Sequence, residues 1–138
     1  MTDKEKKHWL MRYQNSLKRE KELAEEAARL REEAARVTPL LSAAPGGTGD
    51  GQSLSRAVER IVDAQQRLQC QINQCAAIRQ EVLSVIETIG HQRDHEILRR
   101  RYILGQRWET IAAEMGMELR WVYRRHRSAV ASMTIESH

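Results

Sequence analysis

Apolar residues recur every three or four positions along two long segments of the chain, which is the spacing of one face of an α-helix. The first segment runs from Lys4 to Leu41 and has high helix propensity. Ser16 and Glu20 interrupt its apolar stripe, which otherwise consists of Trp9, Tyr13, Leu23, Ala27, Leu30, Ala34, Val37 and Leu41. The pattern predicts a long amphipathic helix whose narrow, partly alanine face allows close approach by a partner helix.

The second segment has a more regular seam, in which gaps of four and three residues alternate. The seam consists of Leu54, Val58, Ile61, Gln65, Leu68, Ile72, Cys75, Arg79, Val82, Ile86 and Ile89. Ser53 is the expected N-cap of this helix, and Gly90 is its expected C-terminal stop. Two explanations stay open for Gln65 and Arg79: they set the register against a partner chain, or they lie at the seam's edge and extend into water.

Residues 42–53 separate the two predicted helices. They read SAAPGGTGDGQS, with Pro45 and four glycines within seven positions, which neither a helix nor a strand tolerates. We therefore predict a flexible loop that folds helices 1–41 and 54–90 into an antiparallel hairpin. Because a two-helix hairpin has a single thin seam, we also expect a homodimer through the long helices.

Three shorter helical units follow within residues 91–138, and Gly105 and Gly116 mark the joints between them. In the last two units, the small residue Ala112 lets one helix cross closely over the other, and Gly116 turns the chain. This arrangement is typical of a helix-turn-helix. The expected fold class is therefore all-α: a long antiparallel helical hairpin followed by a C-terminal three-helix helix-turn-helix domain.

The last helix, predicted over residues 118–131, divides into an apolar face and a basic face. The apolar face consists of Leu119, Val122, Ala129, Val130 and Met133. Arg120, Arg124 and Arg127 recur on the other face at i, i+4 and i+7. Guanidinium groups make bidentate hydrogen bonds to guanine edges and to phosphates, and a helix fits the major groove. The residues expected at DNA are Arg107, Glu118, Arg120, Trp121, Tyr123, Arg124, Arg125 and Arg127.

Several of these residues have more than one interpretation. Glu118 caps the helix or interacts with its dipole, or instead accepts a hydrogen bond from a cytosine amino group. Trp121 stacks on sugar and phosphate, or it seals the domain against the hairpin. Either Arg125 extends to a phosphate, or the helix is rotated so that His126, which we expect to be a packing residue, fills the core. For the whole face, the alternative is an ordinary solvated surface.

Composition and charge narrow the class of protein. Of the 138 residues, 41% are hydrophobic and only 4% are aromatic, so we expect no large, deep core. The charged fraction of 30% and the presence of only two prolines favour an elongated helical protein over a sheet protein. The net charge of +4 permits binding to a polyanion without requiring it. Residues 91–138 are the most basic third, with nine arginines and no lysine. Because the sequence has neither a long apolar run nor a secretory signal, we expect a cytoplasmic protein with no membrane contact.

We find no pattern of catalytic or metal-binding residues. Cys70 and Cys75 are five residues apart in a predicted helix, which is too far for a disulfide, so we expect both to be reduced. His91 and His95 lack a third ligand. The chain also lacks a phosphate-cradling glycine loop and a Ser-His-Asp arrangement. We therefore expect a protein that is not an enzyme and needs no cofactor or metal.

The C-terminal sequence also resembles a known family. ILRRRYILGQRWETIAAEMGMELRWVYRRHRSAV is similar to region 4 of bacterial sigma factors, and more closely to the phage-encoded, sigma-like late transcription regulators of the ArpU and RinA type. The shared features are the RRYI-x-G turn, the W-E-x-IA-x-E-x-G first helix and the VYR-x-H-x-x-A second helix. Glu118 stands where Ser or Thr is common at the cap, and Arg125 stands where an apolar residue is usual.

That resemblance implies a sequence-specific DNA-binding regulator of phage or prophage late genes, acting in a bacterial host cell. It implies double-stranded DNA as a partner and host RNA polymerase as a candidate second partner. It also places Arg120, Trp121, Tyr123 and Arg124 at base edges and phosphates. Two other functions remain open: a small terminase-like DNA-packaging protein, and a coiled-coil protein–protein adaptor that does not bind DNA.

Overall fold

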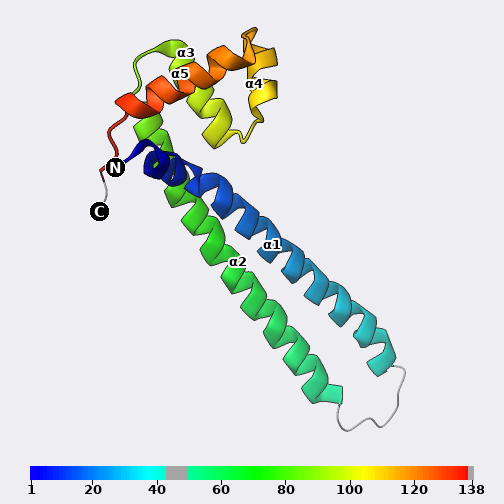
Figure 1. Ribbon diagram of the computed structural model, residues 1–138. Coiled ribbons are helices and arrows are strands. Elements are labelled where there is room, and N and C mark those ends of the chain that lie inside the picture. Colours follow the sequence, from blue (N-terminus) through cyan, green and yellow to red (C-terminus); the bar gives the residue numbers. More distant parts are fainter. Residues whose placement is uncertain (43–49, 137–138) are drawn as a thin grey trace. The chain divides into compact units, whose positions relative to one another are not determined.

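The computed structural model describes the backbone of residues 1–42 and 50–136, and the side chains of residues 1–36 and 51–136. All regular structure within these ranges is helical, which confirms the all-α prediction. Figure 1 shows its elements, which are α1 (Asp3–Ser42), α2 (Asp50–Ile86), α3 (Gln92–Leu98), the π-helical segment η1 (Arg99–Ile103), α4 (Trp108–Met115) and α5 (Leu119–Ser132). None of the described helices is long and apolar enough to span a membrane.

Both ends of α2 differ from those expected from the sequence. The helix begins at Asp50, so residues 50–53 belong to it and Ser53 is not its N-cap. It ends at Ile86, where the Thr88 hydroxyl donates a hydrogen bond to the carbonyl of Val85 at 2.6 Å. This side-chain bond competes with the next helical bond and favours a stop before Gly90. Residues 43–49 of the predicted loop lie outside the described residues.

The chain divides into two compact units. Unit 1 contains Met1–Ser16 and Cys75–His138, and unit 2 contains Leu17–Gln74. The sequence had instead suggested a domain that begins at residue 91. The boundary differs because the first turns of α1 and the last turns of α2 pack into the same core as the C-terminal helices, and only the three-dimensional structure brings these segments together.

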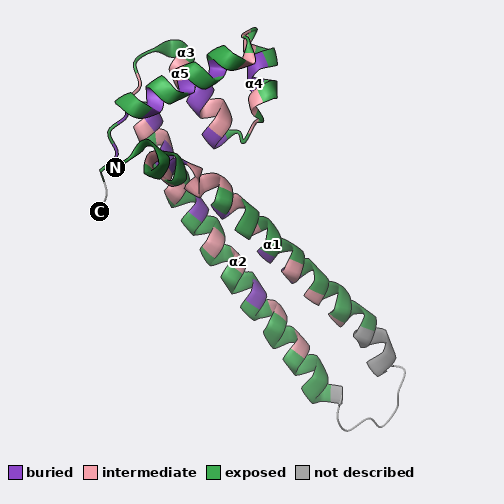
Figure 2. Ribbon diagram, viewed as in Figure 1, coloured by how far each residue is buried: buried purple, intermediate pink, exposed green. Residues whose placement is uncertain are grey.

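Unit 1 contains two clusters of buried apolar side chains. The first cluster packs Leu10 of α1 and Val82 and Ile86 of α2 against residues of α3, η1, α5 and the chain beyond, namely Leu98, Tyr102, Ile103, Ala129, Val130, Met133 and Ile135. The second cluster consists of Ile97, Ile111, Ala112 and Val122. Because α3 and α5 contribute to both clusters, α5 is fixed along its whole length and leaves one face outside. Figure 2 shows these buried positions in purple.

The π-helical segment η1 is held by a side chain from α1. The amide nitrogen of Gln14 donates hydrogen bonds to the carbonyls of Tyr102 and Ile103, at 3.1 Å each. Gly105 follows with a φ of 69°, and a Cβ built there would lie 2.5 Å from Oε1 of Gln14. Glycine therefore serves two purposes at this joint, because it adopts a left-handed backbone and leaves room for the amide.

Unit 2 has a thin core. Here α1 and α2 run in opposite directions (Figure 1), and Arg67 pairs with Glu26 at 3.5 Å. Its buried side chains among the described residues are Leu23, Ala27 and Ala64. Small alanines at these positions allow the two helices to approach closely. The side chains of Val37 and Leu41, at the end of the predicted α1 stripe, lie outside the described ones.

The predicted seam of α2 is only partly the one that faces α1. Ala64 is buried although the seam omitted it, whereas Leu54, Val58 and Ile72 of the seam are between 39% and 49% exposed. Gln65 and Arg79 are exposed as well. The predicted seam is therefore confirmed at Cys75, Val82 and Ile86, which are buried, and is wrong at Leu54, Val58 and Ile72, which are exposed while the smaller Ala64 is buried. Several large apolar side chains of α2 remain without cover in the single chain.

Candidate nucleic-acid interface

The turn between α4 and α5 determines which face of α5 is buried. Gly116 ends α4 in the left-handed conformation, with φ 63° and ψ 38°. The amide of Met117 then bonds the carbonyl of Ala112 at 2.9 Å, which closes the turn in the manner of a Schellman cap. Ala112 is buried beside Ile111 and Val122 in the second core cluster. The small residue at 112 and the turning glycine at 116 are therefore confirmed.

The two faces of α5 correspond to those predicted. Its buried residues are Val122, His126, Ala129 and Val130, and Met133 is buried directly after it. The exposed residues of the opposite face include Arg120, Trp121, Tyr123, Arg124 and Arg127. No Asp or Glu occurs between residues 119 and 132, so this face carries only positive charge. The outer face of α5 is therefore an exposed basic surface.

Glu118 occupies the N-cap position of α5 but does not cap it through its side chain. Its carboxylate instead lies 2.8 Å from Nε of Arg120. Both side chains are largely exposed, and exposed ion pairs contribute little to stability. The pair between Glu118 and Arg120 is therefore weak.

Trp121 is 43% exposed and belongs to neither core cluster of unit 1. The guanidinium carbon of Arg124 lies 4.7 Å from the centre of its ring, and that of Arg120 lies 5.8 Å away. A guanidinium group that stacks on an indole keeps its hydrogen-bond donors free at the edge. Trp121 thus holds two arginines in place rather than filling the interior.

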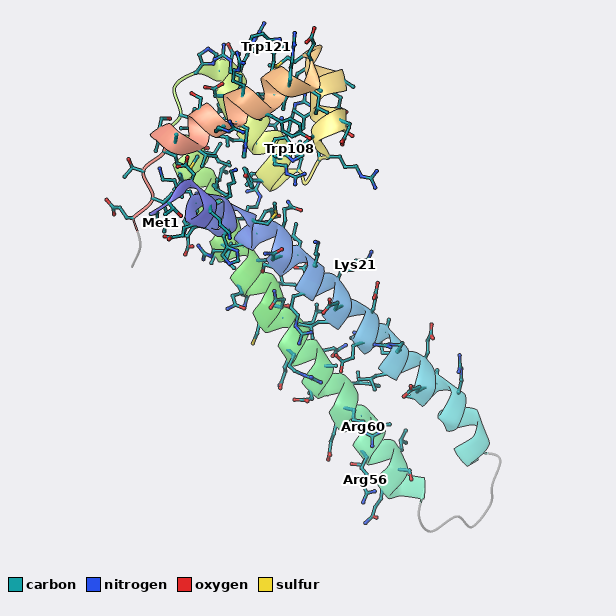
Figure 3. The ribbon with its side chains drawn as sticks, viewed as in Figure 1. Met1, Lys21, Arg56, Arg60, Trp108 and Trp121 are labelled. Atoms are coloured by element: carbon teal, nitrogen blue, oxygen red, sulfur yellow. The ribbon has the colours of Figure 1, made fainter. Side chains whose placement is uncertain are left out.

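Tyr123 and Arg127 lie on the side of α5 that faces α4. Tyr123 is 41% exposed, and its ring meets the ring of Trp108 edge-on with 5.4 Å between centroids. Figure 3 shows Trp108 and Trp121 on opposite sides of α5. Arg107 is exposed at the N-cap position of α4, one residue before Trp108. These residues extend the basic face from α5 toward the start of α4.

Arg125 is the one predicted DNA residue that the structure turns toward the scaffold. Its Nη1 donates to Nε2 of His91 at 3.2 Å and to Oδ1 of Asp94 at 3.5 Å. The Asp94 side chain is largely buried, so Arg125 supplies the positive charge that this carboxylate needs. Arg125 therefore ties α5 to the start of α3, which explains how a charged residue occupies a position at the margin of the core.

His126 fills the core as a neutral packing residue, as the sequence suggested. Its Nε2 lies 2.6 Å from the Tyr102 hydroxyl, and its ring lies 4.6 Å from that of Trp108. Burial, and after it the charges of Lys7 and Arg101, together lower the pKa of His126 to about 4. Burial also raises the pKa of Tyr102 to about 12. The described residues contain no group of side chains suited to a metal ion.

Two cations from outside α5 were not predicted as part of this surface. The Arg101 guanidinium lies 4.5 Å from the ring centre of Trp108 and donates to the carbonyl of Gln106 at 3.0 Å. Lys7 of α1 lines the same region beside Tyr123 and Arg127. The arginine run at residues 99–101 was a visible signal for Arg101. Lys7 gave none, because only folding brings α1 next to α5.

A scan against protein-family models, a search of curated proteins and a search of solved structures found no match for this chain. The resemblance of residues 97–130 to sigma-like regulators therefore stays an expectation from the sequence.

Proposed function

We propose that the protein is a DNA-binding transcription regulator, in which α4 and α5 act as a helix-turn-helix and α5 enters the major groove. The observation that carries this proposal is the outer face of α5. Arg120, Arg124 and Arg127 recur along it and are exposed, and the acidic group paired with one of them is Glu118 at the N-cap, an exposed pair with Arg120. In this proposal the helices α1 and α2 form a hairpin that supports the reading domain and joins two copies.

The chemistry of the face favours base reading over simple charge attraction. Arg120 and Arg124 flank the Trp121 ring, which limits their freedom before DNA arrives. A fixed guanidinium group makes two parallel hydrogen bonds to O6 and N7 of guanine, a contact that depends on its orientation. Arg107 and Arg127, at the edge of the face, suit phosphates on either side of the groove.

The resemblance to sigma-like phage regulators adds a biological setting to this proposal. It supports late phage or prophage genes as the target and host RNA polymerase as a second partner. Both stay predictions that a gene neighbourhood containing terminase and portal genes would strengthen. Assembly into rings would instead favour a small terminase-like packaging protein, and binding that is insensitive to salt would favour a protein adaptor.

The second part of the proposal is a homodimer through α2 in unit 2. Leu54, Val58, Val62 and Ile72 are between 39% and 49% exposed on this helix. Arg67 is the one charged residue between positions 64 and 78. A scarcity of charged residues around exposed apolar side chains is typical of the centre of a protein interface. A second copy of the same helix suits this surface, and a dimer would present two copies of α5 to two half-sites.

The DNA-binding part is tested with duplexes selected from a random library, followed by fluorescence anisotropy. Arg120→Ala combined with Arg124→Ala is expected to weaken binding by about 1–3 kcal/mol for each bidentate contact and to relax specificity at the contacted bases. The matched control is Arg29→Ala combined with Arg60→Ala, which removes the same charge from exposed positions of unit 2. Equal losses in the two double variants would show that the α5 face is not the reading surface.

The dimer is tested by sedimentation at micromolar concentrations. Val58→Glu combined with Ile72→Glu is expected to give a monomer with unchanged helical circular dichroism. Gln74→Glu serves as the control, because it adds charge at an exposed position of the same helix away from the apolar side chains. A wild-type protein that sediments as a monomer would remove the dimer and leave the DNA-binding proposal intact.

A further inference from the structure

A pocket beside α5 gathers positive charge from three elements that are distant in the sequence. Its volume is about 430 Å³. The charged residues that line it are Lys7 of α1, Arg101 of η1 and Arg127 of α5, and the aromatic rings of Trp108 and Tyr123 form part of its wall. No Asp or Glu lines it. We call it the cationic pocket.

We propose that the cationic pocket binds a phosphate group that carries or adjoins a nucleobase. Two sources have this chemistry. One is a phosphodiester of DNA held on α5, which rests on the function proposed above, and the other is the phosphate of a free nucleotide, which does not. In both cases the three cations hold the phosphate, and the aromatic rings offer faces on which a base stacks.

The charge of the pocket is not balanced by the protein itself. Lys7 and Arg127 form no ion pair with any of the residues that the structure describes. Arg101 also lacks a carboxylate partner there, and its Nε is buried without an acceptor. Three cations held together without an anion repel one another, so an anionic ligand is the species that relieves the repulsion.

The remaining side chains that line the pocket include no carboxylate and add no further positive charge. His126 lies at its inner wall and is neutral at ordinary pH, because burial and the two cations Lys7 and Arg101 all lower its pKa. Both cations act on the same ring, which supports their convergence on one place. By contrast, Arg99 and Arg100 of the same arginine run each pair with Glu96 at 2.8 Å, and Arg100 also pairs with Glu114. The structure thus leaves only the pocket arginine of this run without a carboxylate.

The pocket adjoins the face that we assign to DNA. Arg127 belongs to both, since it lines the pocket and lies on the exposed side of α5. Tyr123 is shared in the same way. A phosphate in the pocket therefore lies next to a duplex on α5, and a free nucleotide there would share Arg127 with that duplex.

The experiment uses the full chain labelled with ¹⁵N and follows the indole N–H signals of its three tryptophans. The probes are inorganic phosphate, adenosine monophosphate, adenosine without phosphate, and a selected duplex. Probes with phosphate are expected to shift the signal of Trp108 and leave that of Trp9 in place. Lys7→Gln and Arg127→Gln are each expected to weaken binding by about tenfold, the usual effect of losing a charged hydrogen bond.

Lys4→Gln is the matched control, because Lys4 is an exposed lysine one turn earlier on α1 and does not line the pocket. Lys7→Arg keeps the charge and is expected to restore binding, which separates a lost contact from a lost fold. A shift of Trp108 with adenosine monophosphate supports the free nucleotide. A shift of Trp108 with the duplex alone supports the DNA phosphodiester. In that case the salt dependence of duplex affinity should fall by about one phosphate contact in Lys7→Gln.

The proposal is overturned if no phosphate probe shifts Trp108, or if Lys7→Gln and Lys4→Gln behave alike. Its failure is distinct from failure of the proposed function. If Lys7→Gln leaves duplex binding unchanged, the DNA contact of the cationic pocket is rejected, and the proposal that α5 binds DNA is retained. If the protein binds phosphate but no DNA duplex, the proposal that α5 binds DNA is rejected, and phosphate binding by the cationic pocket is retained.

Discussion

Units 1 and 2 are built from the same two long helices, yet they bury them to different extents. In unit 1, Leu10 of α1 and Val82 and Ile86 of α2 are completely inaccessible, because α3, η1 and α5 cover them. In unit 2 the two helices have only each other, and large side chains such as Val58 stay half exposed. A helix pair hides one strip of each helix, whereas a third layer hides the remaining apolar strips as well. Stability should therefore be concentrated in unit 1.

The largest contrast is expected from matched leucine truncations. Leu98→Ala removes a fully buried side chain of unit 1 and should lower the free energy of unfolding by about 2–5 kcal/mol. Leu54→Ala removes the same atoms from a position of unit 2 that is 39% exposed in the single chain, and it should cost less than about 1 kcal/mol there and more where two copies cover Leu54 as proposed. Urea unfolding of both variants measures the difference. Equal losses would mean that Leu54 is covered in solution, as it would be in the proposed interface of two copies.

Acid should weaken unit 1 through His126. Its pKa is about 4 in the folded protein, whereas an exposed histidine titrates near 6.5. As the pH falls from 6.5 toward 4, His126 becomes protonated in the unfolded chain but stays neutral in the folded chain. The free energy of unfolding therefore decreases by up to about 3 kcal/mol in this window. Above pH 6.5, His126 contributes nothing to the pH dependence of the free energy of unfolding. Glu96, whose pKa is lowered first by its hydrogen bond with Arg99, acts only at lower pH.

This pH dependence is checked by urea unfolding at several pH values between 7.5 and 4.5. His126→Gln should reduce the slope within the window even if it lowers stability at every pH. A wild-type protein with constant stability between pH 6.5 and 4.5 would show that His126 is open to water, which would also remove its place at the wall of the cationic pocket.

The smallest expected effects come from glycine substitutions, and they should have opposite signs in the two units. Gly116→Ala introduces a side chain at a φ of 63° with open space around it, and should cost about 1 kcal/mol from backbone strain alone. Gly105→Ala should cost more, because the new Cβ also displaces Gln14 from its two hydrogen bonds. Gly51→Ala, within α2 and free of contacts, should stabilise by about 0.5 kcal/mol.

Thermal unfolding of the three glycine variants, followed by circular dichroism, ranks them. A Gly105→Ala protein as stable as the Gly116→Ala protein would show that the Gln14 amide moves aside without loss. In that case the link between α1 and η1 would be weaker than its two hydrogen bonds suggest.

Local patterns in the sequence predicted much of the C-terminal region. The turning glycines at 105 and 116, the small residue Ala112 and the two faces of α5 all follow from short-range rules of helix geometry, and the structure confirms them. The exposure of Leu54, Val58 and Ile72 on α2 did not follow, because the spacing of large apolar residues does not show that a small residue such as Ala64 is buried instead. The cationic pocket did not follow either, since Lys7 reaches it only through the packing of α1.

The candidate site was predicted in its residue types more than in its contacts. The row of arginines on α5 was visible from its spacing, but the pattern did not distinguish Arg124, which lies against Trp121, from Arg125, which binds Asp94. That distinction depends on a carboxylate more than 30 residues away in the chain. Short-range periodicity places a side chain on a face, and a distant partner then decides whether that side chain is free to bind a ligand.

Lys6 of α1 donates hydrogen bonds to the carbonyls of Val130 and Ala131 at the end of α5, 124 and 125 residues later in the chain. Synthesis proceeds from the N-terminus, so the first turns of α1 leave the ribosome long before these acceptors exist. Residues 17–74 have their helical partners at hand much earlier. We therefore expect unit 2, the less stable unit, to assemble first during translation. Leu10 should stay exposed to solvent until the C-terminal helices have been synthesised.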